Sequence, residues 1–252
     1  MLRGLSKLSL LLLLCVCACV ADTSEPLPAG PGKQVAVFVA LCDNEHQGIA
    51  PVPEAIGDGM NPARNLYWGC SDALPKVMRA SRDWLRPQWV DNYRKQPKEV
   101  LQAVVCTRAD KRATITAFAY RGDAMSACIR DFEKALHSGS YELVVFLGHN
   151  GLMDFEYPEP PAASVQGADS IVLCCHSHSW FGPHLAALKS RPVLLTQQNM
   201  YPAGALVTSA LDAWLRDPRD VNAIRVAAGK TYAANQGISV KAATGVFAKL
   251  SE

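Results

Sequence analysis

The sequence contains little charge and no long run of charges of one sign. Charged residues make up 19% of the 252 residues, the net charge is +2, and no basic run is longer than Lys111-Arg112. Nucleic-acid-binding proteins gather Lys and Arg on one face or along one helix. We therefore expect no nucleic-acid partner. Apolar residues make up 49% of the chain, which excludes a disordered protein and predicts a globular one.

Several motifs that would indicate a function class are missing. No glycine-rich phosphate loop follows the first apolar run, which argues against a nucleotide enzyme. No C-x-x-C pair is present, so a thiol oxidoreductase is not favoured. No apolar run is long enough to span a membrane as a stable helix, and no repeat of 20 to 50 residues is visible. We expect no cofactor.

The amino-terminal segment resembles an export signal. Residues 1–21 combine the basic Arg3 and Lys7, a short apolar core and small residues up to Ala21. Residues 16–19, Val-Cys-Ala-Cys, resemble a bacterial lipobox with Cys19 as the lipidated residue. Plain cleavage after Ala21 is the alternative. Residues 22–33 are rich in proline and glycine, which predicts a flexible tether.

Exported proteins with this signal lie in the cell envelope, so the sequence predicts a lipoprotein held at a membrane by Cys19. A periplasmic or secreted protein is the alternative. Nine cysteines occur in all, and six of them follow residue 33. An even number in an exported chain is typical of disulfides, although Cys106 and Cys128 lie in apolar runs and are typical of buried thiols.

Short apolar runs alternate with segments of helical spacing over residues 34–252. The runs at 34–41, 142–148, 170–175 and 192–196 are typical of buried strands in a parallel sheet. The runs at 100–107 and 113–120 flank a short charged connector, which predicts a hairpin. Helices are predicted at 71–85, 123–136, 181–189 and 202–216, and from an N-cap at Asp217 to 235 with Gly237 as the stop. This pattern predicts one α/β domain with a mostly parallel sheet covered on both faces.

Two of the predicted strands are followed by residues that carry chemistry. His149 follows the run at 142–148, and Cys175 ends the run at 170–175. Sites in open α/β sheets form outside the carboxyl ends of the strands, so a His and a Cys at two such ends indicate a nucleophilic dyad. Asp154 and Glu156 are carboxylates that could orient His149. The long loop at 45–65 follows the first strand and is expected to form a wall of the same cleft.

The pair resembles the caspase-like superfamily of cysteine peptidases, which includes caspases, legumains, gingipains and clostripain. Members carry an apolar strand ending in His-Gly and a second ending in Ala-Cys. The matching residues here are Leu147-Gly148-His149 and Leu173-Cys174-Cys175, with Asn150 between His149 and Gly151. The resemblance implies a three-layer α/β/α sandwich. It also implies Cys175 as nucleophile, His149 as base, an oxyanion site at the backbone N–H groups of Gly151 and Cys175, and a peptide or protein substrate.

Other interpretations of the same residues remain open at this point. Strand alternation places Ile171, Leu173 and Cys175 on one face, and Val172 and Cys174 on the other, so Cys174 is expected to be buried. His149, Cys174, Cys175, His176 and His178 could instead ligate zinc. A vicinal disulfide between the adjacent cysteines is a further alternative. A non-catalytic binding domain of the envelope is the alternative to a hydrolase.

Overall fold

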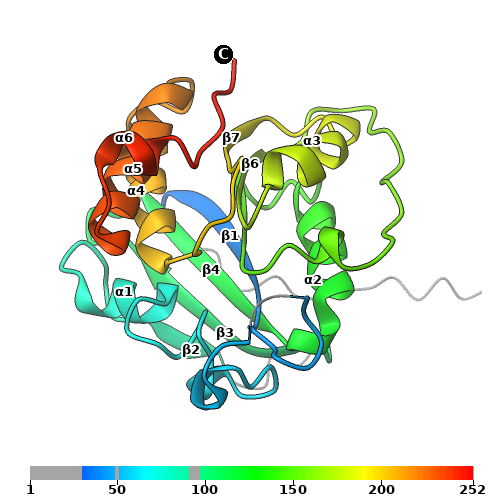
Figure 1. The fold of residues 1–252 in the computed structure, drawn as a ribbon. Helices are drawn as coiled ribbons and strands as arrows, with labels where there is room; N and C mark the ends of the chain where they lie inside the picture. The colour runs from blue at the N-terminus through cyan, green and yellow to red at the C-terminus, as the bar shows by residue number, and fades with distance from the viewer. Residues whose placement is uncertain (1–29, 49–50, 91–96, 252) are drawn as a thin grey trace, which may run out of the picture.

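A seven-stranded sheet organises the protein (Figure 1). The computed structural model describes residues 30–48, 51–90 and 97–251. The predicted leader, Cys19 and tether residues 22–29 lie outside this part. The strand order is β2-β3-β4-β1-β5-β6-β7. The strands are β1 (Lys33–Ala40), β2 (Gln88–Val90), β3 (Val100–Thr107), β4 (Ala113–Tyr120), β5 (Leu143–Leu147), β6 (Asp169–Leu173) and β7 (Pro192–Leu195).

The strands from β4 to β7 in this order run parallel, and β1 is the middle strand of the whole sheet. The antiparallel pairs β3–β4 and β2–β3 extend the sheet at one side. The predicted hairpin of β3 and β4 is confirmed, whereas the short edge strand β2 was not predicted. The parallel strands point their carboxyl ends to the same edge of the sheet. His149 and Cys175 therefore leave the sheet at the same rim.

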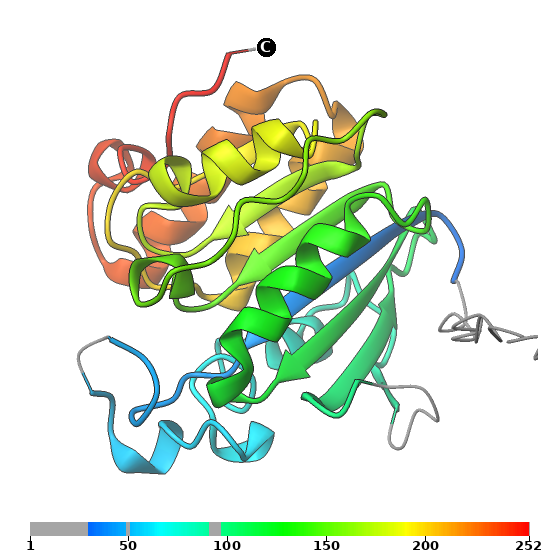
Figure 2. The ribbon, with the colours of Figure 1, turned by 90° about the vertical axis from the view of Figure 1, so that its right-hand side faces the viewer.

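Helices cover both faces of the sheet, as predicted. Figure 1 shows α1 (Leu74–Ala80), α4 (Gly204–Arg216), α5 (Val221–Gln236) and α6 (Val240–Thr244) on one side. Figure 2 shows α2 (Met125–Ala135) and α3 (Ser177–Ala187) lying across the other. Each side has its own buried apolar cluster. The chain is thus an α/β protein of three layers. A separate point is that none of its described helices has the length and apolar character needed to cross a bilayer.

The helix boundaries differ from the predictions at several places. The first helix is shorter than residues 71–85, because a turn precedes it and Ser81 leaves the helical conformation. Helix α5 is capped by Asp220, whose side chain accepts from Ala223 N at 2.7 Å, and not by the predicted Asp217. Asp217 instead ends α4 and accepts from Arg219 N. The predicted stop at Gly237 is confirmed, in the left-handed conformation.

Helix α3 begins at Ser177, four residues before the predicted start, although Pro183 lies inside it. Hydrogen bonds to Thr196, which follows β7, fix the first turn of α3. The backbone N–H of His178 donates to Thr196 O at 2.8 Å, and that of Ser177 donates to Thr196 Oγ1 at 3.1 Å. Tertiary contacts therefore outweigh the local signal of Gly182 and Pro183.

The last residues of the predicted tether are held against the sheet. Gly30 and Gly32 carbonyls accept from the Gln34 side chain, and Pro31 O accepts from Thr114 Oγ1 at 2.9 Å. Lys33 already belongs to β1. Residues 30–33, which the sequence assigns to the tether, therefore contact the sheet.

Candidate active site

His149 and Cys175 follow neighbouring parallel strands. In β5 and β6, Leu147 lies opposite Leu173, and the Gly148 N–H donates to Leu173 O at 3.2 Å. Beyond the strands the two segments remain joined, because Asn150 Nδ2 donates to Cys175 O at 2.7 Å. The structure therefore brings the two predicted residues to adjacent positions on one rim.

His149 is a buried histidine with a fixed partner. Its side chain is 5% exposed, and Nε2 lies 2.6 Å from Asp154 Oδ2. The same carboxylate oxygen accepts from Gly48 N at 3.2 Å. A carboxylate only accepts hydrogen bonds, so the neutral imidazole carries its proton on Nε2 and leaves the lone pair on Nδ1. Of the two carboxylates considered from the sequence, Asp154 is the one that orients His149.

The two adjacent cysteines face opposite sides, as strand alternation predicts. Ile171 and Leu173 join the apolar cluster on one face, and Val172 and Cys174 join the other. Cys174 is fully buried, and burial raises the pKa of its thiol well above the usual range. Cys175 is partly exposed. The residue that the resemblance identifies as nucleophile is thus the accessible one.

The Cys175 sulfur contacts the backbone of Met200, a residue with no signal in the sequence. The Met200 N–H donates to Cys175 Sγ at 3.4 Å, and the thiol lies 3.6 Å from Met200 O. A donor aimed at a sulfur stabilises negative charge on it, and the start of a helix acts in the same direction. Helix α3 starts two residues after Cys175.

The chain turns sharply between Cys175 and α3. His176, the N-cap residue, has φ 52° and ψ 34°, a left-handed conformation that non-glycine residues rarely adopt. Its N–H donates to Gln198 O at 3.1 Å. Strained residues of this kind occur at functional sites, where the surrounding structure holds them. The turn keeps Cys175 at the rim.

Asn150 links the two sides of the site. The sequence places it between His149 and Gly151, and the structure buries it completely. Besides its bond to Cys175 O, its Oδ1 accepts from Leu152 N at 3.2 Å. In the described part of the chain, the N–H groups of Gly151 and Cys175 donate to no other residue. The two N–H groups that the resemblance assigns to the oxyanion thus have no competing partner in that part of the chain.

Residues from the loop after β1 complete one side of the rim. Asp43 is buried and its Oδ2 lies 3.0 Å from His46 Nδ1. Tyr67 lies against Gly148, and its pKa is raised by burial and by the neighbouring thiols, Cys42 and Cys175 among them. The side chains of Tyr67 and Trp68 are thus buried and form part of the wall on this side of the rim.

The zinc and disulfide alternatives find no support in this geometry. Among the described residues, no three His, Cys, Asp or Glu side chains form a group able to hold a metal ion. His178 is exposed. The six cysteines after residue 33 are free thiols.

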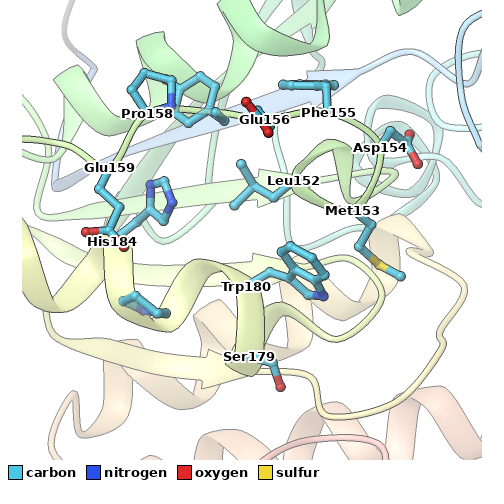
Figure 3. A pocket seen from close by; sticks show the side chains of 12 residues that line it. Leu152, Met153, Asp154, Phe155, Glu156, Pro158, Glu159, Ser179, Trp180 and His184 are labelled. Carbon is cyan, nitrogen blue, oxygen red and sulfur yellow. The ribbon is translucent and has the colours of Figure 1, made fainter.

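An open cavity lies beside the His–Cys rim. It has a volume of about 890 Å³ and lies between α3 and the segment from Leu152 to Glu159 (Figure 3). Asp154, which holds His149, lines it, and so do Ser179 and Trp180 of α3. The cavity thus adjoins both segments that carry the predicted catalytic residues.

Gly148 is required by the path of the chain into His149. Its φ is +145°, and an added Cβ would lie 3.0 Å from Ala40 O. We expect Gly148→Ala to lower the free energy of unfolding by about 1–3 kcal/mol, because an alanine is strained there. It should also reduce any activity by moving His149. Urea unfolding measures the first effect.

Gly182→Ala is the matched control for Gly148→Ala. It lies in α3, and an added Cβ meets nothing within 4 Å. Alanine in a helix interior stabilises by about 0.5–1 kcal/mol relative to glycine. An equal loss in both variants would contradict the role of Gly148.

Comparison of the chain with protein-family models, with curated proteins and with solved structures finds no match.

Proposed function

We propose that the chain is a cysteine hydrolase, a peptidase with Cys175 as nucleophile and His149 as base. The observation that carries the proposal is the position of both residues after adjacent parallel strands, β5 and β6, with Asn150 joining the two segments. The resemblance of these strand ends to those of caspase-like peptidases favours the same reaction. Membership of the fold in the caspase-like superfamily is part of the same proposal.

Each group of the site has a role in the proposed reaction. His149 Nδ1 takes the thiol proton of Cys175, and the resulting thiolate attacks the carbonyl carbon of a peptide bond. The N–H groups of Gly151 and Cys175 stabilise the oxyanion. His149 then protonates the leaving amine as the C–N bond breaks, which leaves a thioester on Cys175. Water, deprotonated by His149, hydrolyses the thioester and releases the acid. Asp154 keeps the imidazole in the required tautomer.

The experiment that tests the proposal is digestion of a peptide library by the full chain, with products read by mass spectrometry. Cleavage that disappears in Cys175→Ala supports the peptidase. Products that are the same in both proteins, or absent from both, contradict it.

A non-catalytic binding domain is the second candidate function. One observation favours it. Within the described residues, the side chains of His149 and Cys175 are hydrogen-bonded to other groups and not to each other. His149 bonds to Asp154, and the Cys175 thiol to the Met200 backbone. A proton transfer requires the two groups to approach within hydrogen-bond reach, although such bonds are often long without substrate. Labelling of Cys175 by a peptide with a thiol-reactive end group distinguishes the two functions, because it requires a reactive thiol beside bound peptide.

We also propose that the chain is exported and held at a membrane by lipid on Cys19. Cys19→Ala should release the protein into the soluble envelope fraction, or stall its processing, without changing the fold, because several acyl chains anchor a lipoprotein firmly and a single chain does not. Mass spectrometry of the mature amino terminus checks this. An unmodified chain beginning at Asp22 would contradict lipidation and indicate a periplasmic or secreted protein.

A further inference from the structure

The cavity beside the rim has an apolar lining that is open to solvent. Trp180 of α3 is 44% exposed, and Met153 and Phe155 on the facing segment are 43% and 36% exposed. Figure 3 shows the side chains of α3 on one side of this space and those of the segment after His149 on the other. Large apolar side chains exposed together around one cavity are typical of a binding surface.

A polar group lies at the inner side of the cavity. His184 is 7% exposed, and its Nδ1 lies 2.7 Å from Glu133 Oε1. The Tyr157 hydroxyl donates to the other oxygen of Glu133 at 3.0 Å. Since Glu133 accepts both bonds, His184 carries a proton on Nδ1. Its Nε2 has no partner among the described residues and, in the neutral ring, accepts a hydrogen bond from a ligand N–H.

The charged side chains that line the cavity are all carboxylates, apart from His184. They are Asp154, Glu156 and Glu159, and no described Lys or Arg lines the space. Asp154 is occupied by His149 and Gly48. Glu156 and Glu159 are exposed and form no ion pair within the described chain. The wall of the cavity therefore has an unbalanced negative charge.

We propose that this cavity binds an extended peptide in which an aromatic or aliphatic side chain is flanked by Lys or Arg. The apolar side chain packs between Trp180 and Phe155, a backbone N–H donates to His184 Nε2, and Glu156 and Glu159 pair with the cations. The inference rests on the proposed function in one respect, since the bound segment is part of the substrate that reaches Cys175. Charge complementarity selects this occupant, because the same carboxylates repel an anionic lipid headgroup.

Binding can be measured without cleavage in the full chain carrying Cys175→Ala. The probe is a fluorescein-labelled decapeptide with one phenylalanine between two lysines. Its binding is measured by fluorescence anisotropy. One comparison peptide replaces both lysines with glutamate, and a second replaces the phenylalanine with glycine. We expect each comparison peptide to bind on the order of tenfold more weakly than the probe.

Substitutions on each wall locate the site. Trp180→Ala should weaken probe binding on the order of tenfold, and Phe155→Ala, on the facing segment, should also weaken it. Trp89→Ala is the control, because Trp89 is 39% exposed on β2 and does not line the cavity. Thermal unfolding of each variant establishes that it folds. Equal binding by Trp180→Ala, Phe155→Ala and Trp89→Ala would overturn the inference.

A second pair of variants tests the charges. Glu156→Gln combined with Glu159→Gln should abolish the preference for the lysine peptide over the glutamate peptide. Glu54→Gln combined with Asp58→Asn, which removes the same charge from the loop after β1, should leave that preference unchanged. An equal effect of both pairs would overturn the local site. Trp180-dependent self-association of the protein, seen by light scattering, would assign the cavity to a second copy and overturn it as well.

The outcome for the cavity is separate from that for the peptidase. Selective binding of the probe, with no cleavage by the wild-type chain, supports the cavity and contradicts the hydrolase. Cys175-dependent cleavage that is indifferent to Trp180 and to the charges of the peptide supports the hydrolase and overturns the cavity.

Discussion

Replacing Cys175 with alanine is expected to lower the rate of peptide hydrolysis on the order of 10³-fold or more, because the thiolate that forms the thioester is lost. The matched control is Cys174→Ala, one residue earlier. Cys174 points into the apolar cluster beneath α2 and α3, so its loss should cost about 1 kcal/mol of stability and little activity. Initial rates on a cleaved library peptide measure the first effect, and urea unfolding measures the second.

The reactivity of individual thiols checks the same assignment. Burial raises the pKa of Cys42 to about 11 and of Cys106 to about 12, and it raises the pKa of Cys128 and Cys174 well above the usual range. These thiols stay protonated at neutral pH, and only the thiolate reacts. Brief alkylation of the folded protein at pH 7.5 should therefore modify Cys175 first, as read by peptide mapping. Cys70 is the other partly exposed thiol of the described residues, and burial and the neighbouring Asp72 raise its pKa as well. Preferential modification of Cys70 or of a buried thiol would contradict this.

Asp154→Asn is expected to lower kcat on the order of 10²–10⁴-fold, because the carboxylate fixes the imidazole tautomer on which general-base catalysis depends. An asparagine amide can donate to Nε2 as well as accept from it. When it donates, the proton of the neutral ring moves to Nδ1, and Nδ1 then has no lone pair with which to take the thiol proton. The amide also weakens the bond from Gly48 N. The effect should appear in kcat rather than in KM and should change the pH profile of the reaction.

Two comparisons separate a positioning role of Asp154 from a structural one. Added to His149→Ala, the Asp154→Asn change should lower the rate little further, because both act through the same imidazole. Glu54→Gln is the control, because Glu54 is an exposed carboxylate that does not line the cavity, and kcat should be unchanged there. Additive losses in the first comparison would assign Asp154 to folding of the segment.

The strand ends were predictable because their signals are local. An apolar run ending in His149 and another ending in Cys175 determine the rim, and a period of two determines which cysteine is buried. The hairpin of β3 and β4 follows from a short charged connector. These elements depend on the order of residues in the chain, and the structure agrees with the sequence there.

The remaining features of the site depend on contacts between distant segments. Met200 contributes backbone atoms, which leave no side-chain signal in the sequence. Asn150 appears in the sequence as an inserted residue, and only the fold shows that its amide reaches Cys175 O. The start of α3 is set by Thr196 from the region after β7, so local helix signals placed it too late. Sequence alone left Asp154 and Glu156 equivalent, whereas the fold turns only Asp154 toward His149.

The direction of β1 places the entry of the described chain and the His149–Cys175 rim at opposite ends of the sheet. The described chain enters at Gly30, beside the amino end of β1, and His149 and Cys175 lie beyond the carboxyl ends of the strands. An eight-residue strand is about 26 Å long. The lipid anchor proposed at Cys19 would therefore join the described chain at the end of the sheet opposite the rim that carries His149 and Cys175. If the proposed anchor is present, we expect the rim to meet partners in the aqueous compartment above the bilayer and not polypeptide embedded in the lipid.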